Sequence, residues 1–414
     1  MGQFRALQEL GLLDRAHYLS TVSGGTWAGA VLVYAPQNRT DLLGRGLGPA
    51  ELTVAGIKAR FTATDMLMGK SVSVEDAPGF VTDDIADLFK DPSRYWTRTI
   101  GDNIFKPYGL YSRDRTCYFT LNASSWAAIV ARNPALAGVC VQTVRTDGQI
   151  PYLVINGGIL GPANRFPVAA NTFPDVVGFE MTPLYAGTPV VTAQMADVVE
   201  PFETKVVPFA TIGGALLETF AFGTPTALVR PSGPTAHALQ TVALAHAPFQ
   251  LALASGISSM AAADGLGRVP VANRVIPDIG YNVLVNGTSD YQTVLVGDGG
   301  DVDNFGLIGM LRRGVQRAVV FVNTDIRVDA RGSTDPCKAI DDDLPPYFGH
   351  NCLDYGIDRR RDTVFPSTYM GPLIEAIQQR ASANEPIVVT QSLPVLNNTF
   401  WGIQGGWTVD VLWV

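Results

Sequence analysis

A serine followed by two glycines is the most reactive arrangement near the start of this sequence. Ser23 ends a short apolar run over residues 18–22 and precedes Gly24, Gly25 and an apolar pattern at helical spacing. A serine at such a strand-to-helix turn exposes its hydroxyl, and the positive end of the helix dipole then faces the reacting group. Serine is also a favoured N-cap, so the same residues are typical of an ordinary capped turn. Thr21 stands where the G-x-S-x-G pattern has its first glycine.

An aspartate followed by two glycines occurs much later in the chain. The apolar run 293–296 leads to Asp298, Gly299 and Gly300, then to a helical pattern over 307–311 and a second apolar run over 318–322. This order predicts a strand, helix and strand with the acid at the carboxyl end of the first strand, where α/β sheets bind ligands. Asp-Gly is also a common turn sequence.

Other groups that could do chemistry carry weaker signals. The aspartates 341–343 could bind a metal, but no suitably spaced oxygen ligands accompany them, so we expect a solvated loop there. We expect neither a metal nor a cofactor for this chain. None of the four cysteines has C-x-x-C spacing, whereas Cys337 and Cys352 flank a polar loop and could form a disulfide. Four N-x-S/T sequons and this cysteine pair weakly favour a secretory history.

The composition limits the class of protein. Of the 414 residues, 47% are hydrophobic and 16% charged, which is typical of a globular protein with a large core. The net charge of −8 and the absence of a lysine or arginine run argue against nucleic acid as a partner. No apolar run reaches the roughly 20 residues that a transmembrane helix needs.

The elements that position Ser23 and Asp298 are expected as follows. Residues 3–13 contain a helical pattern with Gly11 as the expected helix end, before the Ser23 strand. Strand-like runs follow at 152–155 and 190–191. Helical patterns cover 210–222, 236–263 and 373–381. Residues 40–114 have a weak pattern rich in Gly, Pro and Asp, so we expect an insertion over the Ser23 turn, acting as a cap or lid.

Taken together, these motifs resemble the patatin-like lipases. The resemblance is strongest to the lysophospholipase, or phospholipase B, and cytosolic phospholipase A2 catalytic domains. It is carried, in the family's order, by Val-Ser-Gly-Gly-Thr-Trp at 22–27, by residues 178–187 and 253–259, by Gly-Asp-Gly-Gly-x-x-x-Asn at 297–304 and by Arg-Gly-Val at 313–315.

The resemblance implies a fold. We expect an α/β domain with a three-layer, patatin-like central sheet and flanking helices, covering residues 1–414. Its core would comprise 1–39 and 115–330, with 40–114 as the inserted cap and 331–414 as an extension of the same domain. The family's first strand and its glycine-rich oxyanion loop precede the position where this sequence begins, so we expect a start-truncated chain.

The resemblance also implies an activity. Ser23 would be the nucleophile and Asp298 its dyad partner in hydrolysing phospholipid or lysophospholipid esters at a membrane or micelle surface, through an acyl-enzyme. Gly24 and Gly25 are candidate elbow and oxyanion residues, and Gly299 and Gly300 form the turn after the acid. Gly157-Gly158 or Gly213-Gly214 could replace the missing loop, although both pairs read as ordinary turns.

Two alternatives remain open at this point. A homologue without the oxyanion loop could bind lipid or act as a scaffold without turnover. An α/β-hydrolase-type esterase would instead use Ser23, a carboxylate and a late histidine such as His350. The other histidines, His17, His237 and His246, offer no better base by position.

Overall fold

The structure is a computed structural model. It describes residues 2–44, 48, 50, 53–56, 91–162, 176–190, 192–200, 203–212, 215–223, 248–261, 276–285, 288–324, 326–329, 332–352 and 359–414. The chain divides into two compact units, Met1–Val302 and Asp303–Val414. This boundary falls inside the segment 115–330 that the sequence analysis assigns to one core.

The first unit is an α/β structure. Its helices are α1 (Gly2–Glu9), α2 (Gly24–Tyr34), α3 (Arg39–Leu43), α7 (Pro92–Ile100), α8 (Ala123–Arg132) and α9 (Leu251–Ser258). Its strands are β1 (Tyr18–Thr21), β2 (Tyr118–Thr120), β3 (Val141–Thr143), β4 (Tyr152–Pro162), β5 (Val177–Met181), β6 (Tyr185–Thr188), β7 (Thr192–Glu200), β8 (Glu203–Ile212), β9 (Ala215–Glu218), β10 (Asp278–Val285) and β11 (Thr288–Asp298). Helix α11 (Gly300–Asp303) follows at the boundary.

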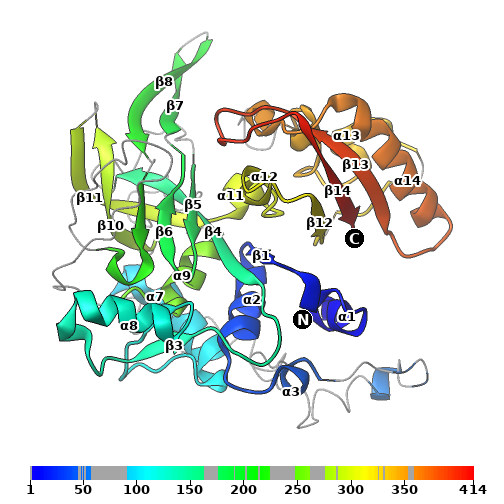
Figure 1. The fold of residues 1–414 in the computed structure, drawn as a ribbon. Coiled ribbons are helices and arrows are strands. Elements are labelled where there is room, and N and C mark those ends of the chain that lie inside the picture. The colour runs from blue at the N-terminus through cyan, green and yellow to red at the C-terminus, as the bar shows by residue number, and fades with distance from the viewer. Residues whose placement is uncertain are drawn as a thin grey trace. The chain divides into compact units, whose positions relative to one another are not determined.

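A nine-stranded sheet organises this unit. The strand order is β7-β8-β10-β11-β4-β5-β6-β9, and β1 pairs with β4. The β1–β4 pair is parallel, whereas the other pairs described for this sheet are antiparallel. Figure 1 shows β7 and β8 as a long hairpin extending beyond the other strands. The α/β class expected from the sequence is therefore correct, with a predominantly antiparallel sheet.

The main hydrophobic core lies between this sheet and three helices. Buried apolar side chains of α2, α7 and α9 pack with those of β4, β5, β10 and β11. The π-helical turn Gly101–Phe105, directly after α7, adds Ile104 and Phe105 to the same core. The described part of the expected lid, from residue 91 onward, thus belongs to the core, whereas residues 57–90 lie outside the described residues.

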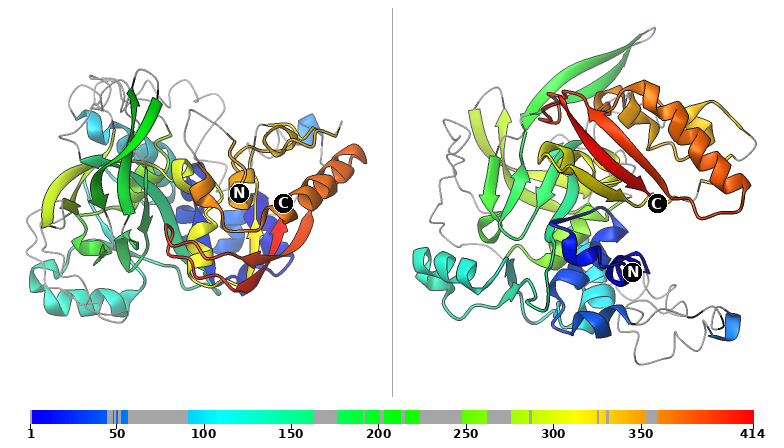
Figure 2. Two further views of the ribbon diagram at one scale, coloured as in Figure 1. Left: turned by 90° about the horizontal axis from the view of Figure 1, so that it is seen from above. Right: turned by 45° about the vertical axis from the view of Figure 1, so that its right-hand side comes forward.

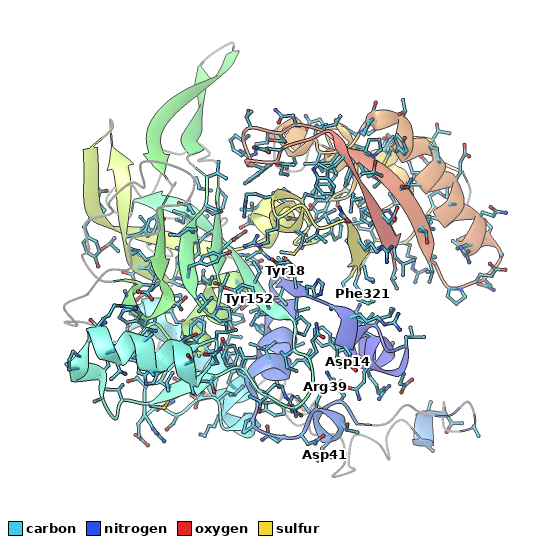
Figure 3. The ribbon with its side chains drawn as sticks, in the orientation of Figure 1. Asp14, Tyr18, Arg39, Asp41, Tyr152 and Phe321 are labelled. Carbon is cyan, nitrogen blue, oxygen red and sulfur yellow. A yellow bond between two sulfur atoms is a disulfide. The ribbon has the colours of Figure 1, made fainter. Side chains whose placement is uncertain are left out.

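The edge of β4 beside β1 is fixed by local contacts. Tyr18 and Tyr152, which are register partners, pack edge to face with their ring centroids 6.2 Å apart (Figure 3). The Tyr152 N–H donates to the carbonyl of His17 at 2.8 Å. Farther along the chain, Arg39 pairs with Asp14 at 2.7 Å, which ties α3 to the segment before β1 (Figure 3).

The second unit contains a smaller sheet. Strands β12 (Arg317–Val320), β14 (Trp407–Trp413) and β13 (Val389–Val395) pair in that order, β12 parallel to β14. Helices α12 (Ile308–Arg312), α13 (Pro336–Ala339) and α14 (Met370–Ser382) complete it, and Figure 2 shows α14 alongside β13. Helix α14 confirms the helix expected over 373–381.

The structure corrects two sequence predictions about elements. Residues 203–212 and 215–218 form strands β8 and β9 instead of a helix over 210–222, since β-branched residues in β8 favour an extended chain. The strand over 317–320 forms, but it pairs with β14 in the smaller sheet. The expected strand-helix-strand unit within one sheet is therefore not built. Of the helix expected over 236–263, residues 251–258 are confirmed as α9, and residues 236–247 lie outside the described residues.

All four cysteines form disulfides. The expected Cys337–Cys352 bond is present, and Cys117 pairs with Cys140 across a 23-residue separation. The Cys117–Cys140 bond closes a segment whose Tyr118, Ile129 and Leu136 form a small core together with Phe220 and Ala221. Among the described residues, no helix combines the length and apolar character that crossing a bilayer requires.

Candidate active site

Ser23 occupies a strained backbone position between β1 and α2. Its φ of 50° and ψ of −133° make it one of two non-glycine residues with positive φ in the described part of the chain. Such conformations cost about 1–3 kcal/mol and persist where the surrounding structure enforces them, often at functional sites. The turn at Ser23 thus has the sharp geometry expected of a nucleophile elbow.

The Ser23 hydroxyl does not cap helix α2. It makes no hydrogen bond to the first turn of the helix and instead donates to Asp298 Oδ2 at 2.8 Å. The two residues are 275 positions apart in sequence. The capped-turn interpretation is therefore wrong, and the predicted encounter of the hydroxyl with the carboxylate is confirmed.

The topology of β4 explains why these two residues meet. Strand β1 runs parallel to the first part of β4 and ends with Thr21 opposite Ile155. Strand β11 runs antiparallel to the last part of β4 and ends with Asp298 opposite Gly157. Since β5 occupies the other edge of β4 over residues 155–159, β1 and β11 share one edge and converge on Asn156 from opposite directions.

A β-bulge adjusts the end of β11. Leu295 pairs with Gly161 but Val296 pairs with Ile159, so Leu160 is an extra residue on β4. Bulges bend a strand and redirect the side chains beyond them. Here the bulge brings Asp298 opposite Gly157, directly beside Asn156.

Burial controls the charge of Asp298. The residue is only 3% exposed, and this burial raises the pKa of its carboxyl to about 6. Hydrogen bonds from the Gly300 N–H to Oδ1, at 2.8 Å, and from Ser23 to Oδ2 oppose the rise because they favour the ionised form. The carboxylate is thus ionised at neutral pH but takes up a proton readily.

The glycines at the two turns have different roles. Gly24 and Gly25 are exposed, and a Cβ added to either would meet nothing within 4 Å in the described structure. The Gly25 N–H donates to the carbonyl of Val22, whereas no hydrogen bond from the Gly24 N–H is found within the described residues. As the first residue of α2, the exposed Gly24 has an N–H without an acceptor inside the helix, so Gly24 is the better oxyanion candidate.

The glycines after Asp298 hold the aspartate in place. A Cβ on Gly299 would lie 2.4 Å from the carbonyl oxygen of Asn156, so only glycine fits there. Gly300 supplies the N–H that binds Asp298 Oδ1. Both residues act as the turn that the sequence predicts after the acid.

The missing elbow glycine has a counterpart in helix α2. The buried Thr21 side chain occupies the space beside Gly29, where an added Cβ would lie 2.6 Å from Thr21 Cγ2. Gly29 thus lets α2 approach β1 closely although position 21 carries a side chain. This compensation was not predicted from the sequence.

The other predicted candidates lie elsewhere or serve the sheet. Gly157 and Gly158 are paired residues of β4, and a Cβ on Gly158 would meet Val176 at 2.3 Å, so their role is close packing. Gly213, Gly214, His237 and His246 lie outside the described residues.

A catalytic triad needs an imidazole to accept the serine proton, but the Ser23 hydroxyl donates directly to a carboxylate.

The aspartate triplet is not the solvated loop that we expected. Carboxylate oxygens of residues 341–343 lie within 4.8 Å of one another, Asp341 is buried, and this burial raises its pKa. The Asn304 amide donates to Asp343 at 2.6 Å. We assign no metal to this cluster.

A polar network missed by the sequence analysis surrounds the pair. It joins Asn156 on β4, Thr26 in the first turn of α2 and Ser258 at the end of α9. The sequence feature that could have indicated this network is the position of Asn156, a polar residue between an apolar run and two glycines.

No protein-family model, curated protein or solved structure matches this chain.

Proposed function

We propose that this chain is a serine esterase that hydrolyses carboxylic esters of glycerophospholipids or lysophospholipids. The observation that carries the proposal is the 2.8 Å hydrogen bond from the Ser23 hydroxyl to Asp298 at a strained strand-to-helix turn. A serine hydroxyl becomes a useful nucleophile when an adjacent base accepts its proton. Asp298 is placed to be that base.

The reaction follows from the contacts of these residues. Ser23 Oγ attacks the ester carbonyl carbon while its proton passes to Asp298 Oδ2. The Gly24 N–H, at the positive end of α2, donates to the oxyanion of the tetrahedral intermediate. As the intermediate collapses, Asp298 returns the proton to the leaving alcohol, and the acyl group remains on Ser23.

Water completes the cycle by the same route. Asp298 removes a proton from water, which attacks the acyl-enzyme, and then returns a proton to Ser23. One group must therefore act as base and acid in turn, which is efficient when its pKa lies near the working pH. The pKa of about 6 for Asp298 meets this requirement.

The proposed substrate class comes from the resemblance to patatin-like lipases. We also propose the three-layer, patatin-like arrangement of the fold on the basis of this resemblance. The open space beside Gly24 and Gly25 is consistent with an acyl ester that approaches the elbow from solvent. With a net charge of −8, we expect transient contact with zwitterionic micelles or membranes in preference to anionic ones.

Labelling with a fluorophosphonate probe tests the proposal directly. We expect the intact mass to rise by the mass of one adduct, and this adduct should map to Ser23. The Ser23→Ala variant should show no such adduct. Asp298→Asn should slow labelling at least about 100-fold, since general-base catalysis contributes about 10² to 10⁴. The exposed Ser124 in α8 supplies the matched control, because Ser124→Ala should label like the parent.

Release of fatty acid from lysophosphatidylcholine micelles tests the substrate class. A folded protein whose Ser23 stays unlabelled would contradict the esterase proposal. If that protein also bound micelles equally well with Ser23→Ala, it would be a lipid-binding protein without turnover.

A further inference from the structure

We propose that Asn156 is the positioning residue that holds Ser23 and Asp298 at reacting distance, an inference that rests on the proposed esterase function. Asn156 lies on β4 between Ile155, the partner of Thr21, and Gly157, the partner of Asp298. It is the β4 residue between the ends of the two strands that carry the reactive groups.

The side chain of Asn156 binds the serine segment. Its Nδ2 donates to the Ser20 hydroxyl and to the Thr21 carbonyl, each at 2.9 Å. Both amide protons are thus used on the last two residues of β1, immediately before the elbow. Anchoring the Thr21 carbonyl fixes the direction in which the chain leaves the strand toward Ser23.

The backbone of Asn156 holds the aspartate segment. Its carbonyl oxygen accepts from the Ser258 hydroxyl at 2.6 Å and lies against Gly299, where an added Cβ would be 2.4 Å away. The Gly299 N–H donates to the Ser258 carbonyl at 3.4 Å. The turn that carries Asp298 therefore packs against the Asn156 carbonyl and is hydrogen-bonded to the end of α9.

A third connection closes the network around the pair. The hydroxyls of Ser258 and Thr26 lie 2.9 Å apart, and Thr26 belongs to the first turn of α2. The elbow helix, the central strand and the aspartate turn thus meet in one set of hydrogen bonds. Removing the Asn156 amide would leave the Ser20 hydroxyl and Thr21 carbonyl without this donor and release the elbow.

Two substitutions separate positioning from simple stability. Asn156→Ala removes the donor, and a misplacement of about 1 Å at a reacting group can cost about 10²-fold in rate. We expect labelling of Ser23 to slow by about 10-fold to 100-fold. Asn156→Asp removes the donor and adds a carboxylate at the β4 residue next to Gly157, the register partner of Asp298, and like-charge repulsion should then raise the pKa of Asp298.

The experiment compares the full chain with both variants and with Asn133→Asp as control. Asn133 also donates its amide to a backbone carbonyl, that of Ile129 at 3.0 Å, but it lies at the end of α8. The rate of Ser23 labelling is measured from pH 4.5 to 8.5. We expect the midpoint of the pH profile to move upward in Asn156→Asp and to stay unchanged in Asn133→Asp.

A measurement independent of activity keeps the two proposals distinguishable. Carboxyl ¹³C NMR of protein with labelled aspartate gives the titration of Asp298 whether or not Ser23 reacts. An upward shift of that titration in the uncharged Asn156→Ala, absent in the control, would report loss of the Ser23 hydrogen bond and would support the positioning role even if the esterase proposal fails. Parent-like labelling rates and an unshifted Asp298 titration in both Asn156 variants would overturn the proposal.

Discussion

Replacing Asp298 with asparagine should make the protein more stable at neutral pH while abolishing its proposed activity. Burial raises the pKa of Asp298 from 3.8 to about 6, so the fold favours the protonated carboxyl. The protonated Asp298 carboxyl contributes to the free energy of unfolding. This contribution is fully present below pH 3.8 and is lost as the pH rises through about 6. At about 1.4 kcal/mol per pH unit, the loss amounts to about 3 kcal/mol.

The asparagine variant lacks this loss because its side chain does not ionise. Its stability relative to the parent should therefore rise between about pH 4 and pH 6 and stay constant above pH 7. The gain is at most about 3 kcal/mol, since an amide cannot accept both hydrogen bonds that Asp298 receives from Ser23 and Gly300 as well as a carboxylate does.

Urea denaturation of both proteins at half-unit intervals from pH 4 to pH 8 measures this difference. Other buried acids with raised pKa values, Asp303 and Asp341, titrate in both proteins and cancel. Ser23→Ala is the internal check, because losing the Ser23 hydrogen bond should raise the pKa of Asp298 further and move its transition upward. A difference between parent and asparagine variant that stays constant across the range would refute the burial argument.

Three further predictions follow from the same structure. The rate of Ser23 labelling should rise with pH through about 6 and level off above pH 7, because Asp298 must be ionised to act as a base; a flat profile would exclude it from that role. Gly29→Ala should destabilise the protein by about 1–3 kcal/mol through its clash with Thr21 Cγ2, and Thr21→Ser should relieve most of that loss in the double variant, as measured by thermal unfolding. Removing the Cys117–Cys140 disulfide with paired serines should cost about 3 kcal/mol in urea denaturation, from the loop entropy of 23 residues; an unchanged midpoint would contradict this.

The sequence predicts the reactive residues better than it predicts their scaffold. The serine turn and the aspartate at a strand end have local signals, namely apolar runs that stop at a reactive side chain and two glycines. Their encounter was expected from the resemblance to a family, and the 2.8 Å hydrogen bond confirms the geometry. The patatin-like arrangement itself stays a prediction.

Strand direction and partner choice could not be read from the same patterns. An apolar run such as residues 293–296 looks the same in a parallel or an antiparallel pair, so the expected strand-helix-strand unit was wrong. The partner of β12 is β14, which lies more than 80 residues later in the chain. Asn156 was missed because its partners Ser20 and Thr21 are distant in sequence, and Gly29 was missed because its importance depends on how closely α2 packs on β1.

Because Leu160 is an extra residue on β4, strand β11 pairs with β4 in two registers, one up to Leu295 and a second, offset by one residue, from Val296 onward. Up to Leu295, side-chain packing within the sheet decides which residues face each other. Beyond that point the offset of one residue sets the position of Asp298. Deleting Gly297, the residue between Val296 and Asp298, would draw the carboxylate back by about 3.3 Å, more than the length of the hydrogen bond it accepts from Ser23.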